Sequence, residues 1–283
     1  MSPIVPSRLG FAVAAAVLAS GLSVAARAQD ASPWAHDTHS AVRLLAGSRN
    51  GPVLLGGIAF QLQPGWKTYW RTPGDSGVPP RFDFAKSDNI EAVTVLWPAP
   101  HEFPDGAGGT SLGYKNQVVL PLRIVAKNPD KPVVLRAAIA YAVCEKLCVP
   151  VEADAELPFS NVASTEDGAL AAAVDTVPKP ARIGDPNPLT IRDVRREGAS
   201  RVIVDVVASD KEEVHLFVEG PTPDWALPVP KQTGPREAGL RHFAFALDGL
   251  PSHATADGAA LKLTLVGASR AYEFNVTLDH AGE

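Results

Sequence analysis

The sequence predicts an all-β protein in which two small β-sandwiches follow one another, with one short helix between them. Most segments are short runs of Val, Leu, Ile and aromatic residues that end at Gly, Pro, Asn or Asp, which is typical of strands and turns. The 26 prolines and 23 glycines also suit a chain of many turns. A chain of many short strands favours the sandwich architecture.

The N-terminus predicts a secretory signal peptide over residues 1–28. Arg8 is followed by the apolar run 9–22, and the small-x-small sequence ARA ends at residue 28. The apolar run is shorter than the roughly 18 residues that a membrane span requires, and no later segment reaches that length. We therefore expect export of a mature chain without a membrane span.

The charge of the mature chain argues against two classes of partner. The signal peptide carries two arginines and no acidic residue, so its removal changes the net charge from −5 to −7. An acidic surface disfavours nucleic acid and anionic lipid as partners. Charge alone indicates nothing more specific.

A first sandwich is predicted over residues 29–160. Its strand candidates combine β-branched residues, leucine and aromatic residues with flanking turn residues. These candidates are 53–63, 90–96, 118–126, 133–143 and 149–159.

A helix and a proline-rich linker are predicted over residues 161–185. The helix runs from about Thr165 to Val174, with Ser164 as its N-cap and two acidic residues in its first turn. Two prolines then end the helix, and the connector ARIGDPNP follows. We place the domain boundary in this connector.

A second small β-sandwich is predicted over residues 186–283. The segments LTIRDV, RVIVDVVAS, EVHLFVEG, LRHFAFAL, LKLTLVG and AYEFNVTLD are its strand candidates. RVIVDVV and YEFNVTL show the alternation of a sheet with one wet face.

The two cysteines of the chain, Cys144 and Cys148, lie at the mouth of a predicted hairpin between the strands 133–143 and 149–159. Residues that face each other beside such a short loop are close enough for a disulfide. Export places them in an oxidising compartment, where a nearby pair is normally bonded. A bridge across so short a loop contributes only about 2 kcal/mol to stability, so the fold does not depend on it.

Residue types alone leave a structural bridge, a redox-exchange pair and a metal clip open. A short-loop bridge at the end of a sheet is accessible and is expected to be strained, and such disulfides are the more oxidising ones. Lys146 in the loop lowers a thiol pKa, whereas Glu145 raises it. Two thiolates also suit Cu(I). The one histidine cluster, His36 and His39, lies in a polar terminal segment where solvation is usual, so we predict no metal site.

Three other segments have ordinary structural explanations. PGDSGVPP around Ser76 is similar to a serine-protease nucleophile loop, but the upstream base signature is absent, so a turn is predicted. In GWKTYWR, Trp66 and Trp70 share one face of an extended strand, as a core pair or as a stacking platform for a sugar. PHEFPDGAGG is predicted to be irregular, and its Phe103 is expected to cover a neighbouring group.

The ordered segments GWKTYWRTPGDSGVPPRF, LWPAPHEF, LGYKNQVVLPLRI and YAVCEKLCVP resemble the N-terminal periplasmic domain of the thiol–disulfide interchange protein DsbD and its relative ScsB, the copper-sensitivity suppressor. The resemblance covers roughly residues 40–160, and the longer β-rich extension of ScsB-like proteins could account for the rest. It implies an immunoglobulin-like β-sandwich, a periplasmic location, and a place in copper tolerance or cytochrome c biogenesis.

The resemblance also implies a redox role for the cysteine pair. Cys144 and Cys148 would receive electrons from a thioredoxin-like or membrane-embedded reductase and pass them to periplasmic disulfide proteins, without any metal or organic cofactor. Phe103 corresponds to a phenylalanine that caps the cysteines in this family. Glu102, together with Glu145 and Lys146 of the hairpin loop, is expected to tune the thiols. The competing hypothesis is a periplasmic module that binds copper or carbohydrate and has a structural disulfide.

Overall fold

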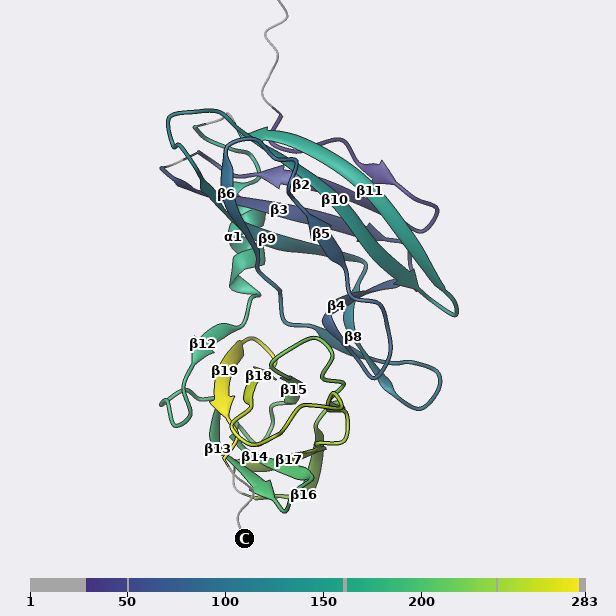
Figure 1. The fold of residues 1–283 in the computed structure, drawn as a ribbon, viewed down its shortest axis with the longest axis vertical. Helices are drawn as coiled ribbons and strands as arrows, with labels where there is room; N and C mark the ends of the chain where they lie inside the picture. Colours follow the sequence, from purple (N-terminus) through teal and green to yellow (C-terminus); the bar gives the residue numbers. More distant parts are fainter. Residues whose placement is uncertain (1–28, 50, 160–161, 238, 280–283) are drawn as a thin grey trace, which may run out of the picture.

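The computed structural model describes residues 29–49, 51–159, 162–237 and 239–279, and the predicted signal peptide at 1–28 lies outside them. The described residues form two β-sandwiches, one in the upper and one in the lower half of Figure 1, with a single helix beside the upper one. The predicted all-β, immunoglobulin-like fold is confirmed. Among the described residues, no helix has the length and hydrophobicity of a membrane span.

The N-terminal sandwich consists of two mostly antiparallel sheets. One has the strand order β1-β2-β3-β9-β6, and the other has the order β11-β10-β4-β8-β7 with β5 paired to β10. The strands are β1 (Ala35–His36), β2 (Ser40–Ala46), β3 (Val53–Leu62), β4 (Lys67–Gly74), β5 (Arg81–Asp83), β6 (Ile90–Val95), β7 (His101–Pro104), β8 (Thr110–Lys115), β9 (Gln117–Ala126), β10 (Val133–Cys144) and β11 (Cys148–Phe159). All five strands predicted from the sequence are present.

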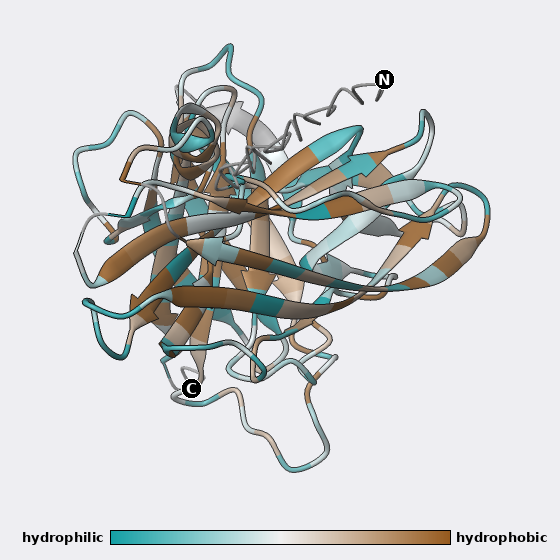
Figure 2. Cartoon of the chain, turned by 90° about the horizontal axis from the view of Figure 1, so that it is seen from above, coloured by the Kyte–Doolittle hydropathy of each residue, from teal (hydrophilic) through white to brown (hydrophobic). Residues whose placement is uncertain are grey.

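Alternating side chains of these strands build the core between the two sheets. On β10, Val133, Leu135 and Ile139 are almost fully buried, and intervening residues face outward. Figure 2 shows the matching hydrophobic stretches along the strands. The pattern that predicted the strands is therefore the pattern that packs the sandwich.

Helix α1 (Asp167–Asp175) begins slightly later than predicted and packs on the first sandwich. Ser164 is not its N-cap, because Glu166 occupies that position without a side-chain cap. The Ser164 hydroxyl instead donates to the carbonyl of Ala46 at 2.6 Å. Leu170 packs against a small cluster on the outer face of the β2–β3 sheet. The helix therefore belongs to the first sandwich.

The C-terminal sandwich pairs the sheets β12-β19-β18-β15 and β13-β14-β17-β16. Its strands are β12 (Lys179–Ala181), β13 (Thr190–Glu197), β14 (Arg201–Val207), β15 (His215–Glu219), β16 (Lys231–Glu237), β17 (Leu240–Ala246), β18 (Ala260–Val266) and β19 (Ala271–Thr277). The six strands predicted here are confirmed. Strand β12 comes from the predicted linker and pairs in parallel with β19. It is the edge strand of its sheet, a position where the missing N–H of Pro180 is tolerated.

One segment that the sequence predicted to be irregular is a strand. His101–Pro104 forms β7, which pairs with β8 at the edge of its sheet. The sequence did not predict this strand because prolines lie on both sides of Phe103, and proline is unfavourable inside a sheet. An edge strand such as β7 accepts proline. The neighbouring turn prediction is confirmed, since Gly74 and Gly77 both have positive φ angles around Ser76.

The two sandwiches meet near β4 and β8, which lie directly above the second sandwich in Figure 1. Phe217 of β15 packs into the hydrophobic core of the first sandwich, and its ring lies 5.9 Å from that of Trp70. Arg71 of β4 pairs with Glu219 of β15 and Glu273 of β19, at 2.6 and 2.7 Å. Apolar packing and ion pairs therefore both join the two sandwiches.

We expect Gly113→Ala to destabilise the sheet that carries the cysteines. A Cβ atom at Gly113 would lie 2.0 Å from the carbonyl oxygen of Thr68, so β8 must move away from β4. Overpacking of this kind costs about 1–3 kcal/mol. Denaturant unfolding measures the loss. Gly168→Ala is the matched control, because its Cβ meets nothing within 4 Å. Equal stability of Gly113→Ala and the parent chain would contradict this close approach.

Candidate functional site

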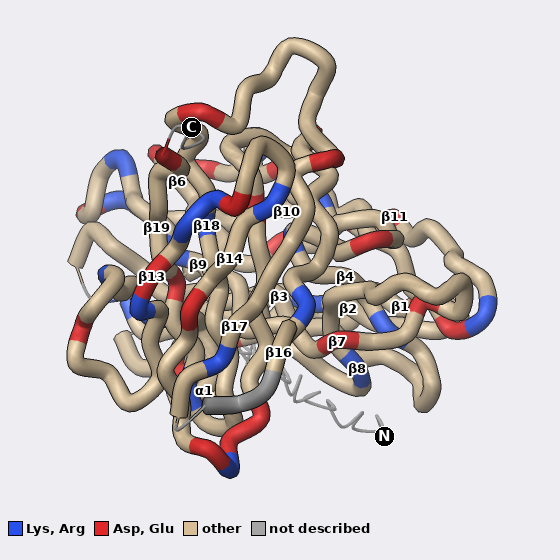
Figure 3. Tube along the Cα trace, turned by 90° about the horizontal axis from the view of Figure 1, so that it is seen from below, with Lys and Arg blue, Asp and Glu red and all other residues tan. Residues whose placement is uncertain are grey.

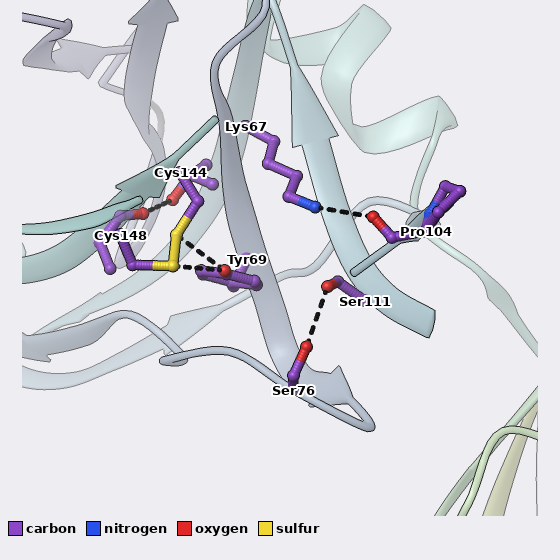
Figure 4. Close-up of a disulfide and its surroundings, with 9 residues drawn as sticks. Lys67, Tyr69, Ser76, Pro104, Ser111, Cys144 and Cys148 are labelled. Carbon is purple, nitrogen blue, oxygen red and sulfur yellow. Dashed lines mark hydrogen bonds between the residues drawn. A yellow bond between two sulfur atoms is a disulfide. The ribbon is translucent and has the colours of Figure 1, made fainter. Parts of the chain in front are cut away.

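The hairpin β10–β11 places both cysteines at its closed end. Its strands pair without a register shift from Val133↔Phe159 to Cys144↔Cys148. Cys144 and Cys148 form a disulfide, with their Cα atoms 4.2 Å apart (Figure 4). The predicted pairing and its position at the end of a sheet are both present in the structure.

The two sulfur-bearing residues differ sharply in exposure. Cys144 is 2% exposed, whereas Cys148 lies at the exposed start of β11. β10 is an interior strand that also pairs with β4, and β11 is the edge strand of the sheet. A partner molecule can therefore approach Cys148, while the protein encloses Cys144.

Tyr69 of β4 supplies the one hydroxyl that contacts the disulfide among the described hydrogen bonds. Its Oη donates to Cys144 Sγ at 2.8 Å and lies 3.2 Å from Cys148 Sγ (Figure 4). Burial, and to a lesser extent the charge of Asp105, raises the pKa of Tyr69, so the phenol keeps its proton near neutral pH. The site thus holds a hydrogen-bond donor against the sulfurs.

The sequence analysis missed Tyr69 as a site residue. The available signal was the alternation of GWKTYWR, which placed Tyr69 on the face opposite the two tryptophans. That alternation is confirmed: Trp70 is buried in the core, and Trp66 stacks on His39 with ring centroids 3.7 Å apart. The strand partner of β4 was not predictable from the alternation.

Lys67 lies opposite Cys144 in the pairing of β4 with β10. It pairs with Cys144 on β10 and with Lys115 on β8, so the three side chains share one face of the sheet. Burial lowers the pKa of Lys67, Asp105 opposes this effect, and Lys115 adds to it. The Lys67 ammonium also donates to the carbonyl of Pro104 at 3.3 Å.

Phe103 lies on this same face, on β7 at the far edge of the sheet. Its ring is 7% exposed and lies beneath the ammonium groups of Lys67 and Lys115, at 5.6 and 4.5 Å. Strands β4 and β8 lie between Phe103 and the strand of Cys144. The described ring contacts of Phe103 are with the two lysines and with His101, whose ring lies 6.5 Å away, and its role as a cap stays a prediction.

The three candidate tuning residues occupy different places. Glu102 points to the opposite face from Phe103 and pairs with His215 of the second sandwich at 3.0 Å. The hydrogen bond that the His215 ring donates to the Glu102 carboxylate raises the pKa of His215, and partial burial opposes this effect. Glu145 and Lys146 are exposed in the turn between the cysteines. Glu102 thus serves the contact between the sandwiches, while the other two remain beside the disulfide.

The described residues contain no group of three or more His, Cys, Asp or Glu side chains that could hold a metal ion. The site thus consists of a disulfide in which Cys148 is an exposed residue and Cys144 a buried one.

Charged residues of both signs are mixed over the molecule. Seen from below, basic and acidic segments lie interspersed along the strands (Figure 3).

Comparison with known proteins identifies the first sandwich. Residues 45–160 match the family model described as "Thiol:disulfide interchange protein DsbD, N-terminal". These residues form a DsbD N-terminal domain. The crystal structure of the N-terminal periplasmic domain of ScsB from Proteus mirabilis superposes with a TM-score of 0.70 at 21% identity, and covers 89% of this chain and 99% of the ScsB chain. The DsbD-type domain and the sandwich after it thus share their fold with ScsB.

Two other solved structures have weaker similarity. A conserved domain protein from Bacillus anthracis has a TM-score of 0.26 at 11% identity, covering 88% of this chain and 78% of its own. A marsupial T cell receptor has a TM-score of 0.23 at 12% identity, covering 88% of this chain and 100% of its own. No curated protein sequence matches this chain. The DsbD-type domain implies a role in thiol–disulfide interchange.

We expect Tyr69→Phe to make the reduction potential of the disulfide more negative by about 20 mV at pH 9. A hydrogen bond to a thiolate is about 1 kcal/mol stronger than one to a neutral sulfur, and 30 mV corresponds to about 1.4 kcal/mol. Equilibration with glutathione buffers measures the potential. Tyr141→Phe is the matched control, because that hydroxyl bonds to Ser40 instead. An unchanged potential at pH 9 would exclude Tyr69 as a thiolate donor.

Proposed function

We propose that this protein is a periplasmic carrier of reducing equivalents. A thioredoxin-like or membrane-embedded reductase reduces the Cys144–Cys148 disulfide, and the reduced pair then reduces periplasmic disulfide proteins. The observation that carries this proposal is the asymmetry of the pair: Cys148 is exposed, and Cys144 is buried beside the Tyr69 hydroxyl. The DsbD-type domain and the fold shared with a periplasmic ScsB domain support it.

Reduction starts at the accessible sulfur. A thiolate of the reductase attacks Cys148 Sγ in line with the disulfide, the bond to Cys144 breaks, and Cys144 leaves as a thiolate. The Tyr69 hydroxyl, 2.8 Å away, stabilises the negative charge that develops on Cys144. A second thiolate of the reductase then attacks the reductase sulfur that is bonded to Cys148. This closes a disulfide within the reductase and releases Cys148 as a thiolate. Two electrons have passed to this protein.

Delivery of the electrons reverses the roles of the two cysteines. The exposed Cys148 thiolate attacks a disulfide of the acceptor protein and forms a mixed disulfide. The Cys144 thiolate then attacks Cys148 Sγ, and the acceptor leaves with its thiols reduced. Cys148 is thus the exchanging residue and Cys144 the resolving residue. No metal or organic cofactor takes part in these steps.

The surroundings of Cys148 suit contact with another protein. Leu147, next to Cys148 at the tip of the hairpin, is 78% exposed. Exposed apolar side chains beside a reactive group favour a protein partner. Glu145 and Lys146 precede Leu147 in the turn and carry opposite charges, and we propose that their effects on the thiols largely offset each other. Phe103 remains a proposed cap through its contact with Lys67.

Single cysteine variants test the order of attack. We expect Cys144→Ser to accumulate mixed disulfides through Cys148, because the residue that would resolve them is missing. We expect Cys148→Ser to accumulate few, because Cys144 is enclosed. The measurement is a non-reducing gel of alkylated periplasmic proteins, with the double serine variant as the control. Trapping by neither single variant would disprove the carrier function, and trapping by Cys148→Ser alone would reverse the order.

Replacement of Leu147 tests the contact with a protein partner. Loss of an apolar contact residue costs about 1 kcal/mol or more, so Leu147→Asn should slow exchange with a thioredoxin-like protein roughly five-fold. Exchange with glutathione should keep its rate, because glutathione does not cover the hairpin tip. Val53→Asn, an exposed position on β3 that is 41% accessible, is the matched control. Equal slowing with both thiols would show that the substitution disturbs the disulfide itself.

A further inference from the structure

Strand β4 leaves the ladder of its sheet immediately after Tyr69. It pairs with β8 at Lys67, Thr68 and Tyr69, and the register then shifts until Gly74. Its pairing with β10 is limited to Lys67 and Thr68. Residues 70–73 therefore lack the regular strand partners that fix the backbone elsewhere in this sheet.

The second sandwich holds residues 70–72 of β4, which have no regular partners in the first sandwich. Trp70 packs on Phe217, and the Arg71 guanidinium binds Glu219 through Nε at 2.9 Å and through Nη2 at 2.6 Å. Arg71 also binds Glu273 at 2.7 Å, and the Thr72 hydroxyl donates to Glu219 at 2.9 Å. Three consecutive residues of β4 are thus attached to the second sandwich.

This attachment is well suited to fix a position. The side chains of Arg71, Glu219 and Glu273 are 19, 15 and 22% exposed, so water competes little for their hydrogen bonds. The planar guanidinium has two carboxylate partners, which restricts its orientation. Lys262 of β18 pairs with Glu273 at 3.3 Å and holds that carboxylate in turn. β15, β18 and β19 are adjacent strands, so the anchor rests on a continuous sheet.

We propose that the second sandwich acts as a clamp on β4, and that Arg71 is a positioning residue that holds the Tyr69 hydroxyl on the disulfide. Tyr69 is the last residue of β4 that pairs with β8 before the register shift, and the anchored residues 70–72 follow it directly. The chain is therefore held on both sides of Tyr69. A second link, Glu102 to His215, ties β7 of the same sheet to the second sandwich. The second sandwich thereby sets the reactivity of a disulfide that lies in the first sandwich. This inference rests on the proposed function.

The test measures the equilibrium of the full-length protein with glutathione. We expect Arg71→Gln to lower the equilibrium constant for reduction of the disulfide about three-fold at pH 9, in the same direction as Tyr69→Phe. In the Tyr69→Phe background, the same Arg71→Gln change should have an effect of less than about 1.5-fold, because the hydroxyl that Arg71 positions is gone. Arg136→Gln is the matched control, since Arg136 also bridges two carboxylates, Asp88 and Glu156, on a distant part of β10.

Each outcome decides the proposal. An effect of Arg71→Gln equal to that of Arg136→Gln, or one undiminished in the Tyr69→Phe background, would overturn it. If Arg71→Gln folds poorly because it leaves carboxylates unpaired, the charge-balanced pair Arg71→Gln with Glu219→Gln is measured in its place, with the same expectation. Because glutathione replaces the protein partner, failure to trap periplasmic proteins with Cys144→Ser would reject the carrier function without affecting this result.

Discussion

The site depends on a short pairing between β4 and β10. Thr68 faces Val143, Lys67 faces Cys144, and the Thr68 hydroxyl donates to the carbonyl of Ala142 at 2.9 Å in a buried position. A β-hairpin with a disulfide at its closed end is not by itself a functional site. The pairing with β4 supplies the other groups that surround the two cysteines. It brings the next residue of β4, Tyr69, against both sulfurs and leaves Cys148 on the free edge strand.

The resulting environment separates two requirements of thiol exchange. Exchange requires one sulfur that a partner can reach, and a leaving sulfur whose negative charge is stabilised. Edge strand β11 meets the first requirement with Cys148, and interior strand β10 meets the second with Cys144 beside a phenol that keeps its proton. Burial alone would disfavour the Cys144 thiolate, so the Tyr69 hydroxyl offsets a cost that the fold itself imposes.

The second sandwich has a structural basis for influencing this chemistry. Residues 70–73 lack regular ladder partners. The second sandwich holds them instead, because its Glu219 and Glu273 bind Arg71 and its Phe217 packs on Trp70. Because Phe217 also packs into the core of the first sandwich, the two units share apolar surface. The position of Tyr69 is therefore a property of both sandwiches.

The sequence by itself determined the all-β class, five strands of the first sandwich and six of the second, and the cysteine hairpin with its exposed position, because these follow from local alternation and loop length. It did not determine β7, whose prolines are acceptable only at an edge, or β12, which depends on a strand nearly a hundred residues later in the sequence. The tertiary structure alone decided that Tyr69 meets the sulfurs, that Glu102 pairs with His215, and that Cys144 rather than Cys148 is enclosed. The physical reason is that strand order and register are long-range properties, which the pattern within a single strand does not specify.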